Sequence, residues 1–165
     1  MLNTIVDRPN LSAFMCPYGL RLEVTGKRIE PDPVVLACRI TGEDRWFRRC
    51  GGQGVSRDMV VRCLANKPYG CRSTILYVSV RRRRFQECAH AWRREIGQAA
   101  PPRVKLSRSA VRLALPGVDA HHLTMARMTK ALGVSLNAAN TVVLAERVRL
   151  LINDSARFEG GVSLA

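Results

Sequence analysis

The sequence has few acidic residues and no long apolar run. Its 165 residues include 13 aspartates and glutamates against 27 lysines and arginines, so the formal net charge is +14. No apolar stretch approaches the roughly 18 residues that a membrane-spanning helix needs. Asp7 and Arg8 stand where a signal peptide would be apolar. We therefore expect a cytoplasmic protein that has no membrane partner.

The sequence also lacks a set of residues that would indicate catalysis. Its C-terminal third holds Asp119, Glu146, Asp154 and Glu159, but no spacing pairs these carboxylates into an acid–base or two-metal site. We expect no enzymatic activity from this chain as it stands.

Basic residues are concentrated in the middle of the chain. Residues 45–94 contain 13 basic and 2 acidic side chains, whereas residues 1–44 contain 5 and 6. A folding chain with this surplus favours polyanionic partners, because each basic side chain set against a phosphate releases counterions. The densest run, Arg81, Arg82, Arg83 and Arg84, is therefore predicted to contact phosphates. A bias toward arginine codons explains the choice of arginine over lysine, but it does not explain this clustering.

The first two-thirds of the chain reads as strands and turns. Alternating or β-branched runs at 20–24, 34–40, 59–64 and 73–80 are separated by residues that favour turns. In the last run, alternation places residues 74, 76, 78 and 80 on one face of the strand. These runs predict a small antiparallel sheet within a first domain at residues 1–98.

Helical periodicity begins after a predicted linker at residues 99–102, where two prolines are consecutive. A first helix is expected over 105–115, where Pro116 and Gly117 would end it. Thr124 and Ser135 are predicted N-caps of two further helices, which end at Gly133 and at about residue 153. The fold class predicted is α+β, with a three-helix domain at residues 103–153.

The segment Gly133-Val134-Ser135 fits the turn of a helix-turn-helix. Glycine can adopt the left-handed conformation that ends one helix, and serine caps the next. The first turn of the last helix would then present four polar side chains to base edges in a major groove. These candidate readers are Ser135, Asn137, Asn140 and Thr141. Arg108 and Arg112, on the first predicted helix, are candidate phosphate contacts without a nearby carboxylate in sequence.

The six cysteines raise the question of zinc, although the sequence contains no Cys-x-x-Cys pair. Cys50 and Cys88 lie in segments that resemble zinc knuckles, each with a phenylalanine three residues before the cysteine. Four donors could be gathered from Cys50, Cys88 and His90 together with Cys63 or Cys71. In the alternative interpretation the cysteines are small buried residues and the phenylalanines fill the space of a metal.

Several stretches taken together resemble the N-terminal part of transposases of the ISL-three insertion-sequence family. The matching stretches are 20–26, 30–32, 35–39, 46–51, Val80 with the arginines that follow it, 88–92, 102–107, 122–127, 132–135, 139–140, 143–146 and 149–154. The resemblance implies a zinc-ribbon-like module, a helix-turn-helix that recognises the ends of the element, and then a catalytic domain with an Asp-Asp-Glu triad.

Two departures from the family pattern shape the prediction. Phe47 and Phe85 stand where the family has the first cysteine of each pair, which leaves Cys50 and Cys88 as two of four zinc ligands. Residues 154–165 read as the truncated start of the catalytic domain. The expected protein is thus a DNA-binding fragment that contacts double-stranded DNA and pairs with itself or with a full-length transposase. A small nucleic-acid-binding regulator or an RNA-associated zinc-ribbon relative is the alternative.

Overall fold

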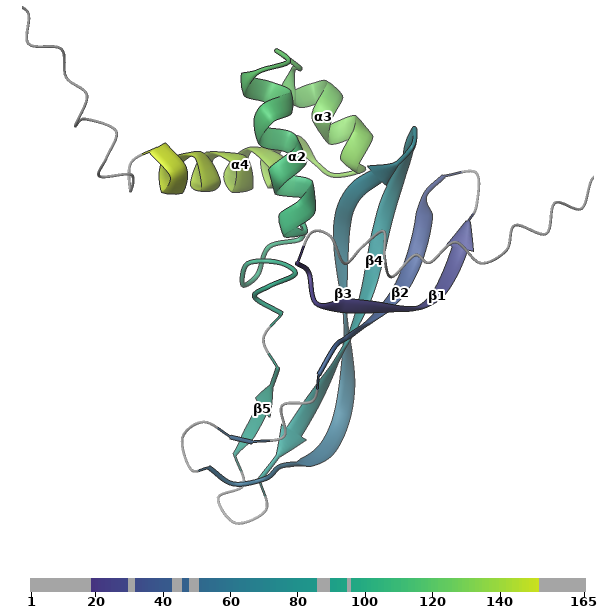
Figure 1. The fold of residues 1–165 in the computed structure, drawn as a ribbon, viewed down its shortest axis with the longest axis vertical. Coiled ribbons are helices and arrows are strands. Elements are labelled where there is room, and N and C mark those ends of the chain that lie inside the picture. The colour runs from purple at the N-terminus through teal and green to yellow at the C-terminus, as the bar shows by residue number, and fades with distance from the viewer. Residues whose placement is uncertain are drawn as a thin grey trace, which may run out of the picture.

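The structure, a computed structural model, describes residues 19–29, 32–42, 46–47, 51–85, 90–94 and 96–151. It confirms the α+β class: three helices stand at one end of a five-stranded sheet (Figure 1). The strands are β1 (Leu22–Ile29), β2 (Val34–Ile40), β3 (Val55–Tyr69), β4 (Arg72–Arg84) and β5 (Ala91–Arg93). The helices are α2 (Arg108–Asp119), α3 (Met125–Leu132) and α4 (Leu136–Leu151).

The sheet is mixed, so the prediction of a purely antiparallel sheet was wrong. Its order is β1-β2-β4-β3, and β2 runs parallel to β4 while the β1–β2 and β3–β4 pairs are antiparallel. The hairpin formed by β3 and β4 meets β2 through β4, whose alternate residues are the most completely buried. β3 carries exposed side chains such as Met59 and Val61 and takes the edge.

One face of the sheet carries its core, and the alternation predicted for β4 is confirmed. Thr74, Leu76, Val78 and Val80 are all buried on that face. Leu36 and Cys38 of β2 lie beside Leu76 and Val78 and extend the same apolar layer. The opposite face is much more exposed, since Tyr77 of β4 and Met59 and Val61 of β3 all reach solvent.

Both ends of α3 and the start of α4 are those that the sequence predicts, while the end predicted for α4, at about residue 153, lies outside the described residues. The Thr124 hydroxyl accepts a hydrogen bond from the Arg127 amide, and α3 ends at Gly133 in the left-handed region, with φ of 66°. The Ser135 hydroxyl accepts from the Ala138 amide and caps α4. These caps depend on contacts within a few residues, so local sequence determines them.

The helix α2 continues through Pro116 and Gly117, so the predicted stop at these residues was wrong. The Pro116 carbonyl accepts from the amides of Ala120 and His121 and closes a further turn. Gly117 is buried, and a Cβ atom there would lie 2.4 Å from the Met128 Cε atom. The end of the Met128 side chain on α3 therefore packs directly against the backbone of α2 at Gly117.

The helices are attached to the sheet through a buried polar cluster. The Asn66 Oδ1 atom on β3 accepts hydrogen bonds from the hydroxyls of Ser107, at 2.6 Å, and Ser109. Ser107 is also the N-cap of α2, because its hydroxyl accepts from the Ala110 amide. The Ala65 amide donates to the Lys105 carbonyl, and the Ser107 amide donates to the Ala65 carbonyl. The start of α2 is thus fixed to the edge of β3.

The segment predicted as a linker, residues 99–102, contributes to this packing. Ala99 and Ala100 are 1% exposed and belong to the core of the sheet. The Ala99 carbonyl accepts from the Arg108 amide at 2.8 Å, which ties the segment to the first turn of α2. Within the described residues, no helix has the length and apolar character needed to cross a membrane.

Replacement of Asn66 tests the importance of the polar cluster. We expect Asn66→Ala to lower the free energy of unfolding by about 1–3 kcal/mol, because the buried hydroxyls of Ser107 and Ser109 lose their acceptor. Urea unfolding followed by circular dichroism measures the change. Ser56→Ala, an exposed position on the same strand, is the matched control. Equal unfolding midpoints for the two variants would contradict this role of the cluster.

Candidate nucleic-acid interface

The turn between α3 and α4 is held tightly against the sheet. The Gly133 and Val134 amides donate to the carbonyls of Lys130 and Thr129, so the end of α3 is satisfied by the backbone. A Cβ atom on Gly133 would lie 3.2 Å from the Ser73 Cβ atom at the start of β4. Ser73 is itself held by hydrogen bonds from its amide and hydroxyl to the Asp32 carboxylate. The sheet therefore fixes where the first turn of α4 points.

The packing behind this turn agrees with the apolar positions read from the sequence. Met128, Leu132 and Ala139 are buried, while Val134 and Val142 are half-buried. Thr129 occupies a position at which a helix-turn-helix usually has a smaller residue. Its buried hydroxyl donates to the Ala126 carbonyl at 2.9 Å, which satisfies the extra polar group.

The four candidate base readers differ in whether their side-chain hydrogen-bonding groups are available to contact a base edge. Asn137 is exposed, and Asn140 is half-buried. The Ser135 hydroxyl caps α4, and the Thr141 hydroxyl donates to the Asn137 carbonyl at 2.9 Å. A carboxamide offers both a donor and an acceptor, which is the pattern that an adenine edge needs. Asn137 is therefore the side chain best placed to read a base.

Arg108 and Arg112 have a carboxylate nearby, contrary to the sequence-based expectation. Their positive charges, together with hydrogen bonds from Arg149, lower the pKa of Glu146 on α4, and the Arg149 bonds are the main cause. The Arg108 Nε atom donates to the Gly97 carbonyl at 2.7 Å. Helix packing brings Glu146 to α2 from more than thirty residues along the chain, which local sequence does not reveal.

The run Arg81–Arg84 does not form a single patch, because consecutive residues of a strand point to opposite faces. Arg81 and Arg83 share the exposed face of the sheet with Tyr77. Arg82, on the other face, lies 3.4 Å from the Asp58 carboxylate, and Arg83 donates to the Gly54 carbonyl at 3.1 Å. The four arginines therefore divide between two surfaces.

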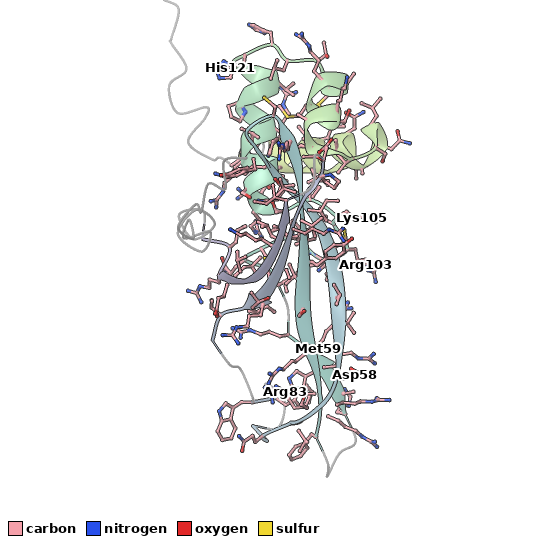
Figure 2. The ribbon with its side chains drawn as sticks, turned by 90° about the vertical axis from the view of Figure 1, so that its right-hand side faces the viewer. Asp58, Met59, Arg83, Arg103, Lys105 and His121 are labelled. Carbon is pink, nitrogen blue, oxygen red and sulfur yellow. The ribbon has the colours of Figure 1, made fainter. Side chains whose placement is uncertain are left out.

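These arginines also lie far from α4. Gly133 contacts Ser73 at the start of β4, while β5 pairs with Arg82–Arg84 at the other end of the strand. The eleven residues from Ser73 to Arg84 span about 36 Å of strand. Figure 2 shows Arg83 and Met59 low on the sheet, with His121 at the far side of the helices. The α4 readers and the arginine run therefore cannot contact the same base pairs.

Two arginine-lined cavities occupy the lower part of the sheet, and sequence reasoning missed them. The larger, about 360 Å³, is lined by Arg39, Arg81, Arg83 and Arg94 with Glu23 as its carboxylate. The smaller, about 180 Å³, is lined by Arg62, Arg93, Arg94 and Arg103. Burial and the neighbouring charge of Arg93 lower the pKa of Arg62. Only strand pairing, which sequence spacing does not reveal, brings these distant arginines together.

The zinc ligands proposed from the sequence cannot all be placed. Cys50 and Cys88 lie outside the described residues. Cys63 pairs with Tyr77 on β4. His90 precedes Ala91, which pairs with Arg84, about 23 Å farther along the same strand. Cys71 lies farther away, in the hairpin turn. The structure therefore does not bring Cys63 or Cys71 beside His90. Among the described residues, no three His, Cys, Asp or Glu side chains are grouped as metal ligands would be.

Aromatic side chains connect the two knuckle-like segments. The Phe47 ring stacks on Trp92 with a centroid distance of 4.8 Å and lies 5.3 Å from the His90 ring. The Phe85 and Trp92 rings pack over the backbone at Gly52 and Gly54. The Phe47 amide donates to the Gly52 carbonyl, and the Phe85 amide donates to the His90 carbonyl. This packing agrees with the alternative in which phenylalanines occupy the middle of the module. The cysteines fit this alternative only in part: Cys38 is buried, and burial raises the pKa of its thiol to about 11, whereas Cys63 and Cys71 are exposed.

No protein family, no curated protein and no solved structure matches this chain. The geometry and charge of the described residues are therefore the basis on which a function can be inferred.

The ion pair of Glu146 predicts a small pH dependence of stability. The folded-state pKa of this carboxylate lies below its ordinary value of 4.5, so its contribution is present above that pH and is lost as the pH falls through the folded-state pKa. We expect Glu146→Gln to cost a few tenths of a kcal/mol at pH 7. The difference from the unmodified protein should shrink as the pH falls below 4.5, as measured by urea unfolding. A difference that grows on acidification would contradict this assignment.

Proposed function

We propose that the helical part binds double-stranded DNA, with the first turn of α4 in the major groove. The observation that carries this proposal is the α3–turn–α4 unit, in which two caps and the contact with Ser73 fix Asn137 in an exposed position. A rigid helix start that presents a free carboxamide can read adenine through two hydrogen bonds.

The charge near this turn supports the same assignment. Neither α3 nor the first turn of α4 carries an acidic residue, and the first carboxylate along α4 is Glu146. Exposed basic side chains on the adjacent helices include Arg127, Lys130 and Arg112. The positive end of the α4 dipole also faces outward at Ser135, where a phosphate would be stabilised.

The two halves of α4 differ in the surface that they expose. Asn137 and Thr141 continue at helical spacing into Leu144 and Val148, which are 57% and 50% exposed. Only the polar N-terminal half suits a groove lined by base edges and phosphates. The DNA contact therefore involves the first two turns of α4 rather than its whole length.

The resemblance noted in the sequence supplies the target class for this proposal. If the chain is assigned by this resemblance, the sheet is a degenerate zinc-ribbon-like module and the three helices are the helix-turn-helix of a transposase. The bound duplex is then the end of an insertion sequence. The chain would occupy such an end without cutting or joining strands.

Selection from a pool of randomised duplexes tests the proposal and identifies the target sequence at the same time. We expect a short motif to be enriched, and Asn137→Ala to lose about 1–3 kcal/mol of preference at one position of that motif. Fluorescence anisotropy over a salt series measures the affinities. Gln98→Ala, which removes an exposed carboxamide away from α4, is the matched control.

The result against the proposal is equally clear. Equal affinity for selected and scrambled duplexes, unchanged by Asn137→Ala, would mean that α4 reads no bases. A steep dependence on salt with no preference for sequence would leave only phosphate contacts by arginines.

A further inference from the structure

The exposed face of the sheet combines an aromatic ring, apolar side chains and an arginine-lined cavity along one strand. Tyr77, Ser79, Arg81 and Arg83 follow one another on this face of β4. Met59 lies beside Arg81, and Val61 lies beside Ser79. From Tyr77 to Arg83 the strand spans about 20 Å, which is long enough for several nucleotides of an extended chain.

We propose that this face binds single-stranded DNA, with a base stacked on Tyr77 and the phosphodiester chain held by the arginines of the larger cavity. The site is distinct from α4, and its ligand is distinct from a duplex. The proposal therefore does not depend on the function proposed for the helices.

The surroundings of Tyr77 suit a stacking platform. Tyr77 is 41% exposed although it belongs to β4, which is paired on both sides. Its two cross-strand neighbours are Ala37 on β2 and Cys63 on β3, which are small and exposed themselves. Neighbours of this size leave room for a planar base above the phenol ring. Stacking on aromatic side chains accepts every base, because each base has a π-face.

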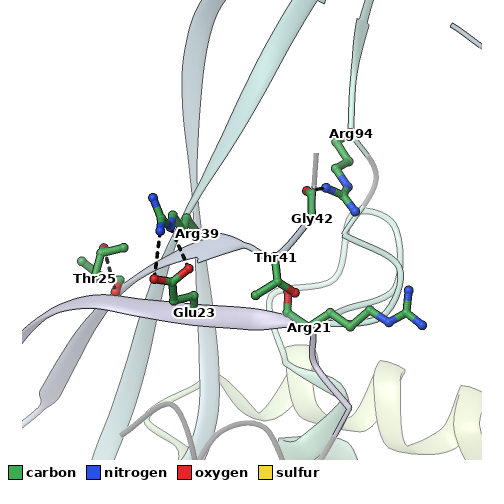
Figure 3. Close-up of polar contacts among 8 residues, drawn as sticks. Arg21, Glu23, Thr25, Arg39, Thr41, Gly42 and Arg94 are labelled. Carbon is green, nitrogen blue, oxygen red and sulfur yellow. Dashed lines mark hydrogen bonds and ion pairs between the residues drawn. The ribbon is translucent and has the colours of Figure 1, made fainter. Parts of the chain in front are cut away.

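A notch between β2 and β5 creates the cavity at the other end of this path. Both strands pair with the same side of β4, but β2 ends opposite Ser79 and β5 begins opposite Arg82. Arg94 closes the notch, because its guanidinium donates to the Gly42 carbonyl just after β2 (Figure 3). Residues 40–42 therefore line one side of the cavity, and Arg94, which follows β5, lines the other.

The charge of the cavity favours an anionic chain. Four arginines line it, and its carboxylate, Glu23, is already engaged by Arg39 through two hydrogen bonds of 2.9 Å (Figure 3). These bonds lower the pKa of Glu23 and keep it ionised, so Arg39 is largely neutralised. Among the described residues, Arg83 and Arg94 donate to backbone carbonyls rather than to carboxylates, so their charges make this part of the cavity positive. Its volume of about 360 Å³ lies in the range of roughly 300–1,000 Å³ that holds small ligands.

A duplex would fit this surface less well than a single strand. The platform and the cavity lie on the same face of the sheet, and Tyr77 can stack only on a base that is exposed. In a duplex the faces of the bases are covered by their neighbours, so only the arginines would contribute. The apolar exposure of Met59 and Val61 beside the arginines also suits unpaired bases rather than a phosphate surface.

Binding of a labelled oligothymidylate of about 15 nucleotides, measured by fluorescence anisotropy with the full chain, tests this proposal. We expect Tyr77→Ser to weaken binding at least about fivefold, because stacking contributes about 1–3 kcal/mol per base. Tyr77→Phe retains the ring and should bind like the unmodified protein. Tyr69→Ser is the matched control, since Tyr69 is 43% exposed at the hairpin end, away from the cavity.

Two further comparisons separate stacking from charge. An abasic oligonucleotide of the same length retains the phosphates but offers no base, so it should bind more weakly and be insensitive to Tyr77→Ser. Arg81→Gln should reduce the slope of log affinity against log salt by about 0.7, whereas Arg127→Gln, on α3, should not. Asn137→Ala should leave oligothymidylate binding unchanged, which distinguishes this site from the proposed duplex site.

Four outcomes would overturn the proposal. Equal affinity for the abasic and the thymidylate oligonucleotides would mean that the face binds anions nonspecifically and does not contact bases. Equal losses with Tyr77→Ser and Tyr69→Ser, or loss with Tyr77→Phe, would show that the ring does not stack on a base. Tighter binding of polyglutamate than of oligothymidylate would indicate an acidic protein segment as the partner.

Discussion

The hydrogen-bonded cluster of Asn66, Ser107 and Ser109 is the constraint on which the remaining structure depends. Asn66 is 1% exposed and both serines are buried, so an unpaired group at this place would cost about 1–3 kcal/mol. The cluster is satisfied only when the start of α2 lies against the edge of β3. It therefore determines where the helices stand on the sheet, and through α2 it positions α3 and α4.

This attachment explains why the candidate surfaces lie at opposite ends of one body. The turn before α4 contacts Ser73 at one end of β4, and the arginine-lined cavity surrounds Arg81 and Arg83 near the other. A tether between the sheet and the helices would leave their separation variable. Here β4 itself is the spacer, and its length is set by strand geometry.

The sequence predicts the local features of this fold better than the long-range ones. The caps at Thr124, Gly133 and Ser135 depend on side chains within one helical turn, and all three are where the pattern places them. The parallel pairing of β2 with β4 depends on residues forty positions apart, and no local pattern encodes it. The same is true of the cavity, because the predicted arginine run supplies only Arg81 and Arg83 to it. Arg39 and Arg94 join them only through strand pairing.

The distance between the two surfaces has a consequence if both proposals hold. Along β4, Tyr77 lies about 13 Å from Ser73 and Arg83 about 33 Å from it, and the second distance is close to the 34–36 Å of one turn of DNA. A duplex held by α4 and extending along the sheet would offer Tyr77 only bases covered by their neighbours. Strands that separate within the first turn beyond α4 would expose bases to the ring and phosphates to the arginines. The same rigid body would then favour a junction between double-stranded and single-stranded DNA over either form alone, because only a junction engages both surfaces at once.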